Sequence, residues 1–71
     1  MTTASFQGLL EAHQGRVLRA ALGMLGDREE AREAAQDALA KAYAARERYD
    51  PERPFYPWLY RIVRNLSLIH I

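Results

Sequence analysis

The sequence contains no cysteine, one tryptophan and three prolines. Without cysteine, disulfide bonds and thiolate zinc sites are excluded. No stretch approaches the roughly 20 apolar residues that a membrane-spanning helix needs, and the N-terminus lacks the basic and then apolar run of a secretory signal. These absences predict a soluble, cytoplasmic protein that has no membrane partner.

Large apolar side chains are also scarce. Hydrophobic residues make up 49% of the 71 positions, but 12 residues are alanine, and each alanine contributes little buried area. A chain this short buries only about 60% of the surface that its unfolded form exposes. The sequence therefore predicts a single small domain whose helices must approach each other closely.

The charges are distributed unevenly along the chain. The formal net charge is +1. Residues 27–47 contain six acidic and four basic side chains, whereas residues 48–71 contain two acidic and four basic ones. This distribution predicts that the middle segment meets a basic partner and the last segment an acidic one.

The first predicted helix has an apolar face from Phe6 onward and ends at Gly26, where glycine is favoured in the left-handed conformation. The helix also has a second apolar face, which consists of Leu18, Leu22 and Leu25. This second face predicts that the helix packs on two sides or leaves one face for another domain. The main apolar face recurs at helical spacing and consists of Phe6, Leu9, Leu10, His13, Val17, Ala20, Ala21 and Met24.

The second predicted helix runs from Asp27 to about Arg48 without glycine, proline or a β-branched residue. Asp27 and Glu30 have the spacing of a capping box. Helical periodicity predicts a buried side and an outward side for this helix. The buried side consists of Ala31, Ala35, Ala38, Leu39, Ala42 and Tyr43. The outward side consists of Glu33, Gln36, Asp37, Ala40 and Ala44.

Residues 49–54 contain two prolines and a turn-forming aspartate, which predict a loop. The third predicted helix follows, with Pro57 tolerated in its first turn. Its predicted inward residues are Phe55, Leu59, Ile62 and Leu66, with Trp58 and Val63 at the two edges. Because no strand pattern is present, the predicted fold is all-α, a compact three-helix bundle.

Two segments together resemble region 2 of sigma factors of the extracytoplasmic-function type. The run from Ala31 to Tyr43, AREAAQDALAKAY, is similar to the family pattern A-E-D-L-V-Q-E-V-F-L-R-A-W. The run from Phe55 to Asn65, FYPWLYRIVRN, is similar to F-x-x-W-L-x-x-I-x-R-N. With the first helix included, the resemblance covers residues 6–68 and implies a sigma region 2 domain over residues 1–65.

The sequence departs from the family pattern at several positions. Alanines replace larger aliphatic residues in the second helix, which implies a thinner core, and Arg32 stands where an acid is common. Ile69 occupies the position of the family's aspartate. Residues 66–71, LSLIHI, also match one translated frame of a transposase end sequence used in sequencing libraries, so we expect this tail to be adapter-derived and encoded by CTG-TCT-CTT-ATA-CAC-ATC.

The resemblance implies that the second helix binds the RNA polymerase core at the β′ clamp helices. Two acids and an amide one turn apart can form charge-assisted hydrogen bonds with an arginine-rich helix, and small alanines permit close approach. The alternative is an ordinary solvated helix face. The predicted polymerase-binding residues are Glu33, Gln36, Asp37, Ala40 and Lys41.

The resemblance also implies that the third helix and the preceding loop hold the non-template strand of the minus-ten promoter element. Arginines would bind phosphates and exposed rings would stack on bases, with a flipped base captured in the 48–55 loop. The alternative is a polar surface with scattered arginines. The predicted DNA-binding residues are Arg53, Tyr56, Tyr60, Arg61, Arg64 and Asn65, with Tyr56 and Tyr60 preferred for stacking.

No residue set predicts catalysis, a metal or a cofactor. His13 lies on the apolar face, and the only other histidine is His70 in the tail, so a packed histidine is favoured over a metal ligand. The sequence contains no Gly-rich phosphate loop, and we expect no enzymatic activity. A small helical protein-interaction module without DNA binding is the alternative function, and an anti-sigma factor remains open as a further partner.

Overall fold

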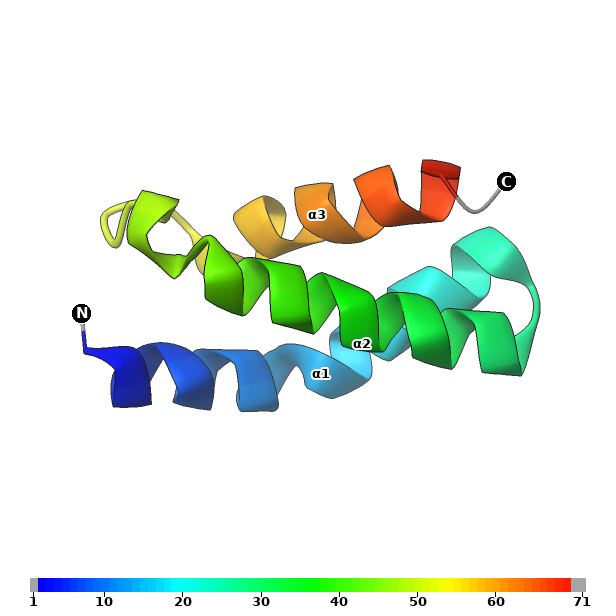
Figure 1. The fold of residues 1–71 in the computed structure, drawn as a ribbon, viewed down its shortest axis with the longest axis horizontal. Helices are drawn as coiled ribbons and strands as arrows, with labels where there is room; N and C mark the ends of the chain where they lie inside the picture. Colours follow the sequence, from blue (N-terminus) through cyan, green and yellow to red (C-terminus); the bar gives the residue numbers. More distant parts are fainter. Residues whose placement is uncertain (1, 70–71) are drawn as a thin grey trace.

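The computed structural model describes the backbone of residues 2–69 and the side chains of residues 2–66. Three helices, α1 (Thr3–Leu25), α2 (Arg28–Ala44) and α3 (Phe55–Ile69), are joined by a tight turn and by a loop that starts with the short 3₁₀ helix η1 (Arg46–Arg48). Successive helices run in opposite directions along the long axis of the bundle (Figure 1). The predicted three-helix all-α fold is confirmed, and residues 2–69 contain no strand.

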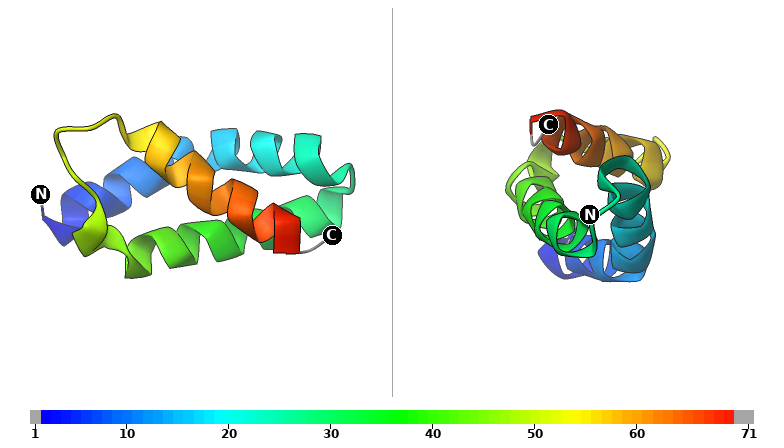
Figure 2. Two further views of the ribbon diagram at one scale, coloured as in Figure 1. Left: turned by 90° about the horizontal axis from the view of Figure 1, so that it is seen from above. Right: turned by 90° about the vertical axis from the view of Figure 1, so that its right-hand side faces the viewer.

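The most extensive packing in the bundle is between α1 and α2. Figure 2 shows α3 crossing over this pair at an angle. Alanines make the close approach possible, since Ala31, Ala34, Ala38 and Ala42 of α2 are completely buried. A buried methyl group leaves little distance between backbones, so the alanine-rich sequence produces a narrow bundle that is 18 Å across in its two short dimensions.

The helix ends follow from local hydrogen bonding. The Asp27 carboxylate accepts from the Glu30 backbone N–H at 3.0 Å, which confirms Asp27 as the N-cap. Gly26 adopts a φ of 73°, as predicted for the end of α1. The α1 helix begins at Thr3, because the Thr2 hydroxyl accepts from Ser5 N–H and caps it.

The prediction that α2 continues to about Arg48 was wrong. The helix ends at Ala44 and tightens into η1. Arg46 explains the change, because its guanidinium donates to the Tyr43 carbonyl at 2.9 Å and lies 4.3 Å from the Tyr43 ring centroid. A side chain that binds a terminal carbonyl satisfies an acceptor that further helix would otherwise satisfy.

One predicted burial assignment needs correction, and two further buried residues were not predicted. Val63 is completely buried whereas Ile62 is half-buried, the reverse of the prediction. Ala34 lies fully in the core, because α2 is covered by α1 on one side and by α3 on the other. Tyr49, which was assigned to the loop, is only 8% exposed.

Residues 66–71, which are predicted to be adapter-derived, begin within α3. Leu66 is buried, as its inward position on α3 predicted, and the helix continues to Ile69. Residues 70 and 71 of that tail lie outside the described residues. The adapter origin of the tail stays a prediction, tested by its codons. Of the helices within residues 2–69, none combines the length and apolar character needed to cross a lipid bilayer.

Candidate functional site

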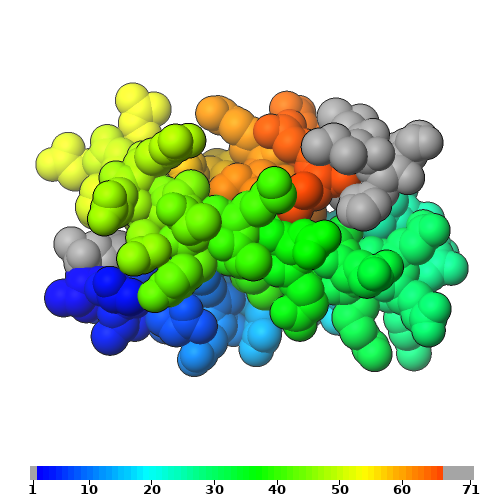
Figure 3. Space-filling model, in the orientation of Figure 1, coloured from blue at the N-terminus to red at the C-terminus, as the bar shows by residue number. Residues whose placement is uncertain are grey.

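The outward face of α2 carries the residues predicted for polymerase binding. The helix is unbroken from Arg28 to Ala44. Space-filling atoms of α2 run along the middle of one face of the molecule, between α1 and α3 (Figure 3). All five predicted side chains, Glu33, Gln36, Asp37, Ala40 and Lys41, are exposed.

The structure brings three of these residues into one shallow hollow. Glu33, Gln36 and Asp37 line it together with Glu29 and Arg32. Arg32 places a positive charge within an otherwise acidic set. Gln36 and Ala40 also border a second hollow toward α1, which sequence reasoning missed; it is lined by Gln7, Leu10, Glu11, Gln14, Gln36, Leu39, Ala40 and Tyr43. Gln36 therefore stands where the two hollows meet.

The loop before α3 is anchored by Tyr49. The Tyr49 hydroxyl donates to the Arg53 carbonyl at 2.6 Å, and the ring packs between Phe6, Phe55 and Trp58 with centroid distances of 5.2–6.2 Å. Trp58 is half-buried and packs against this aromatic cluster, which agrees with its predicted position at the edge of the inward face. The cluster attaches the loop to α1 and α3.

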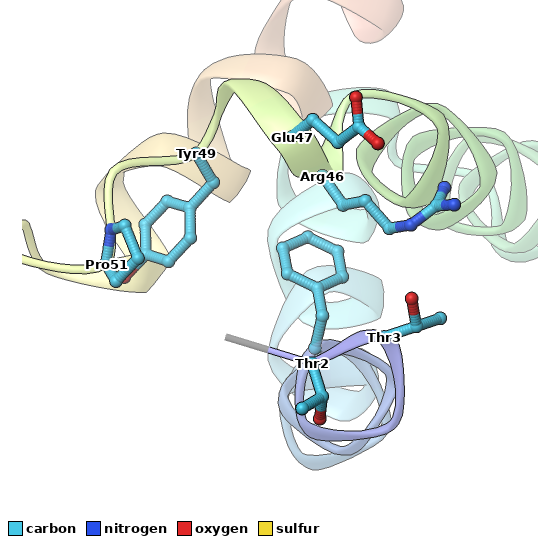
Figure 4. Close-up of a pocket in the computed structure, with 7 residues that line it drawn as sticks. Thr2, Thr3, Arg46, Glu47, Tyr49 and Pro51 are labelled. Carbon is cyan, nitrogen blue, oxygen red and sulfur yellow. The ribbon is translucent and has the colours of Figure 1, made fainter.

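A further hollow lies at this end of the bundle, between the start of α1 and the loop. Figure 4 shows Thr2 and Thr3 on one side and Arg46, Glu47, Tyr49 and Pro51 on the other, and Phe6 completes the lining. Sequence reasoning did not identify this hollow, because its two walls are more than 40 positions apart in the chain. It borders the loop predicted to capture a base.

Most of the residues predicted to bind DNA are exposed on α3 and the loop. Tyr60, Arg61, Arg64 and Asn65 are exposed on α3. The Arg53 side chain is 81% exposed, and its 3.7 Å ion pair with Asp50 is of the weak surface type. Arg53 is therefore able to exchange Asp50 for another anion.

Tyr56 differs from the other predicted DNA-binding residues. Its side chain is half-buried, and the Arg16 guanidinium lies over its ring at 3.6 Å from the centroid. His13 is half-buried beside it and also contacts Phe55, which agrees with the packed role predicted for this histidine. No pattern in the sequence predicts the Arg16 contact.

Comparison with known proteins identifies the family of the chain. The chain matches the family "Sigma-70 region 2" over residues 9–71. It is 33% identical over 67 residues to the ECF RNA polymerase sigma factor SigW of Bacillus subtilis (strain 168). That alignment covers 94% of this chain and 36% of the relative. The chain is 34% identical over 67 residues to the RNA polymerase sigma-H factor of Pseudomonas aeruginosa, covering 94% and 35%.

No solved structure matches the chain significantly. The chain spans about a third of the length of these two relatives. The family match includes nearly all of the bundle, from the first half of α1 through α3. The chain therefore belongs to the sigma-70 region 2 family and is related to ECF sigma factors.

Proposed function

We propose that this chain acts in transcription initiation as region 2 of a sigma factor, docking on the β′ clamp helices of RNA polymerase core. The observation that carries the proposal is the unbroken α2 helix with Glu33, Gln36 and Asp37 exposed around one hollow. Carboxylates form short, charge-assisted bonds with arginine donors. The exposed methyl groups of Ala40 and Ala44 let a partner helix lie close to the α2 backbone.

The second half of the proposal concerns DNA. In it, the 48–55 loop and the exposed side of α3 hold the opened non-template strand of the minus-ten element. Tyr56, Tyr60 and Arg64 recur every four residues and so follow one side of the helix. Arginines at phosphates and rings beside bases are the combination that single-stranded nucleic acid requires. The chain itself catalyses no reaction in this function.

The docking test uses the double variant Gln36→Ala with Asp37→Lys. We expect it to abolish binding to isolated β′ clamp helices, measured by calorimetry. Truncating a hot-spot contact costs about 2 kcal/mol or more, and the new lysine would repel an arginine-rich partner. Glu52→Lys is the matched charge-reversal control, because Glu52 is exposed on the loop rather than on α2. Unchanged affinity of the double variant would refute docking through this face.

A fluorescent single-stranded minus-ten oligonucleotide tests the DNA half. We expect the chain to bind this strand when polymerase core is present, with an affinity that falls steeply as salt is raised, because phosphate contacts release counterions. A helical protein-interaction module, the alternative function, would dock on its partner yet leave the strand unbound. Anisotropy measured with and without polymerase separates the two functions.

A further inference from the structure

An arginine of α1 covers a tyrosine of α3. The Cζ atom of Arg16 lies 3.6 Å from the ring centroid of Tyr56. His13, one turn earlier on α1, is stacked against the same ring with an interplanar angle of 17° and centroids 6.0 Å apart. The His13 Nδ1 atom lies 2.8 Å from the Leu9 carbonyl oxygen, which fixes the imidazole on its own helix. Tyr56 is thus held in place by two side chains of α1.

The Arg16 guanidinium lies between the Tyr56 ring and solvent. Arg16 is exposed, whereas Tyr56 beneath it is half-buried. A molecule that approaches this point therefore meets a guanidinium before it meets the phenol ring. An exposed arginine on a ring gains about 0.5–1 kcal/mol from the cation–π attraction, which restrains the planar group while leaving it accessible.

The same point adjoins the side of α3 assigned to DNA. The Tyr60 ring centroid lies 5.9 Å from that of Tyr56, and Tyr60 is 38% exposed. Arg64, one turn beyond Tyr60, is also exposed. Arg16 consequently extends a row of aromatic and basic groups from α3 onto α1.

We propose that Arg16 is a nucleic-acid contact residue of α1, on whose guanidinium an unpaired base stacks while the Tyr56 ring supports it from behind. This inference rests on the DNA half of the proposed function. Guanidinium planes stack on bases much as aromatic rings do, and the positive charge adds attraction to the anionic strand. Tyr56 acts in this arrangement as a positioning residue.

The test is Arg16→Lys in the 71-residue chain, bound to RNA polymerase core. Lysine keeps the charge but lacks the planar group that stacks. We expect binding of the single-stranded minus-ten oligonucleotide to weaken by about fivefold or more, while the slope of affinity against salt concentration stays the same. Arg19→Lys is the control: Arg19 is exposed on α1 but borders a hollow toward α2 with Leu22 and Arg28. We expect this control to bind like the unaltered chain.

Several results would overturn the assignment. Equal affinities of Arg16→Lys and the unaltered chain would exclude stacking, and so would equal losses for Arg16→Lys and Arg19→Lys. If only Arg16→Ala weakens binding, with a shallower salt slope, Arg16 contacts phosphate instead. If the unaltered chain fails to bind the strand at all, the proposed DNA function itself falls, and the role of Arg16 falls with it.

Discussion

Replacing Phe6 with alanine is expected to lower the free energy of unfolding by about 3–5 kcal/mol. Phe6 is only 2% exposed. Its ring contacts Tyr49, Phe55 and Trp58, with centroids 6.2, 5.5 and 5.9 Å apart, and the last two pairs meet edge to face. Edge-to-face pairs contribute about 0.5–1.5 kcal/mol beyond the burial of their area.

The expected loss is large relative to the whole domain. Stability of about 0.05–0.15 kcal/mol per residue leaves a chain of 71 residues little to spare. Phe6 also joins the start of α1 to the loop and to α3, so its removal loosens three segments together. Urea unfolding followed by circular dichroism measures the effect.

Phe6→Leu is the matched control, because leucine fills most of the volume but forms no ring contacts. We expect a smaller loss for leucine than for alanine. Equal unfolding midpoints for Phe6→Ala and the unaltered chain would show that the aromatic cluster does not hold the end of the bundle.

Leu59→Ala is expected to destabilise the fold by about 2–5 kcal/mol. Among the residues that the structure describes, Leu59 is the largest completely buried side chain, and it lies on α3. Since both α1 and α2 pack against α3, the cavity would open inside the thin core. The buried alanines of α2 have only one methyl group each, so they cannot extend to fill it. Thermal unfolding of the purified variant, followed by far-ultraviolet circular dichroism, provides the measurement.

Leu22→Ala is the control for Leu59→Ala, because it makes the same substitution at a surface position. It is 38% exposed on the second apolar face of α1, so Leu22→Ala should cost about 1 kcal/mol or less. The difference between the two leucines isolates burial from the chemistry of the substitution. Similar losses at both positions would contradict the packing of α3 described above.

Local signals in the sequence predicted much of the fold. Asp27 and Gly26 mark the turn between α1 and α2 because capping and left-handed glycine depend on a few adjacent residues. Helical spacing placed Glu33, Gln36 and Asp37 outward, and all three are exposed. A helix periodicity repeats every few residues, so it can be recognised before any partner helix is known.

The sequence did not predict burial correctly where contact with a neighbouring helix determines which side chains are buried. Val63 and Ile62 are adjacent apolar residues near the edge of the same helix face, and only the crossing angle of α3 selects which one is completely buried. Tyr49 follows η1 and precedes Asp50 and Pro51, which is a typical loop environment. Its burial depends on Phe6, which is distant in the chain.

By itself, the sequence determined three helices, the boundary at Gly26, the start of α3 after the proline-containing loop, and the acidic outer face of α2. Those features depend on neighbours within one or two helical turns. Only the tertiary structure decided that Phe6 reaches Tyr49 and that Arg16 covers Tyr56. Contacts between residues so far apart in the chain depend on how the helices cross, which no local pattern encodes.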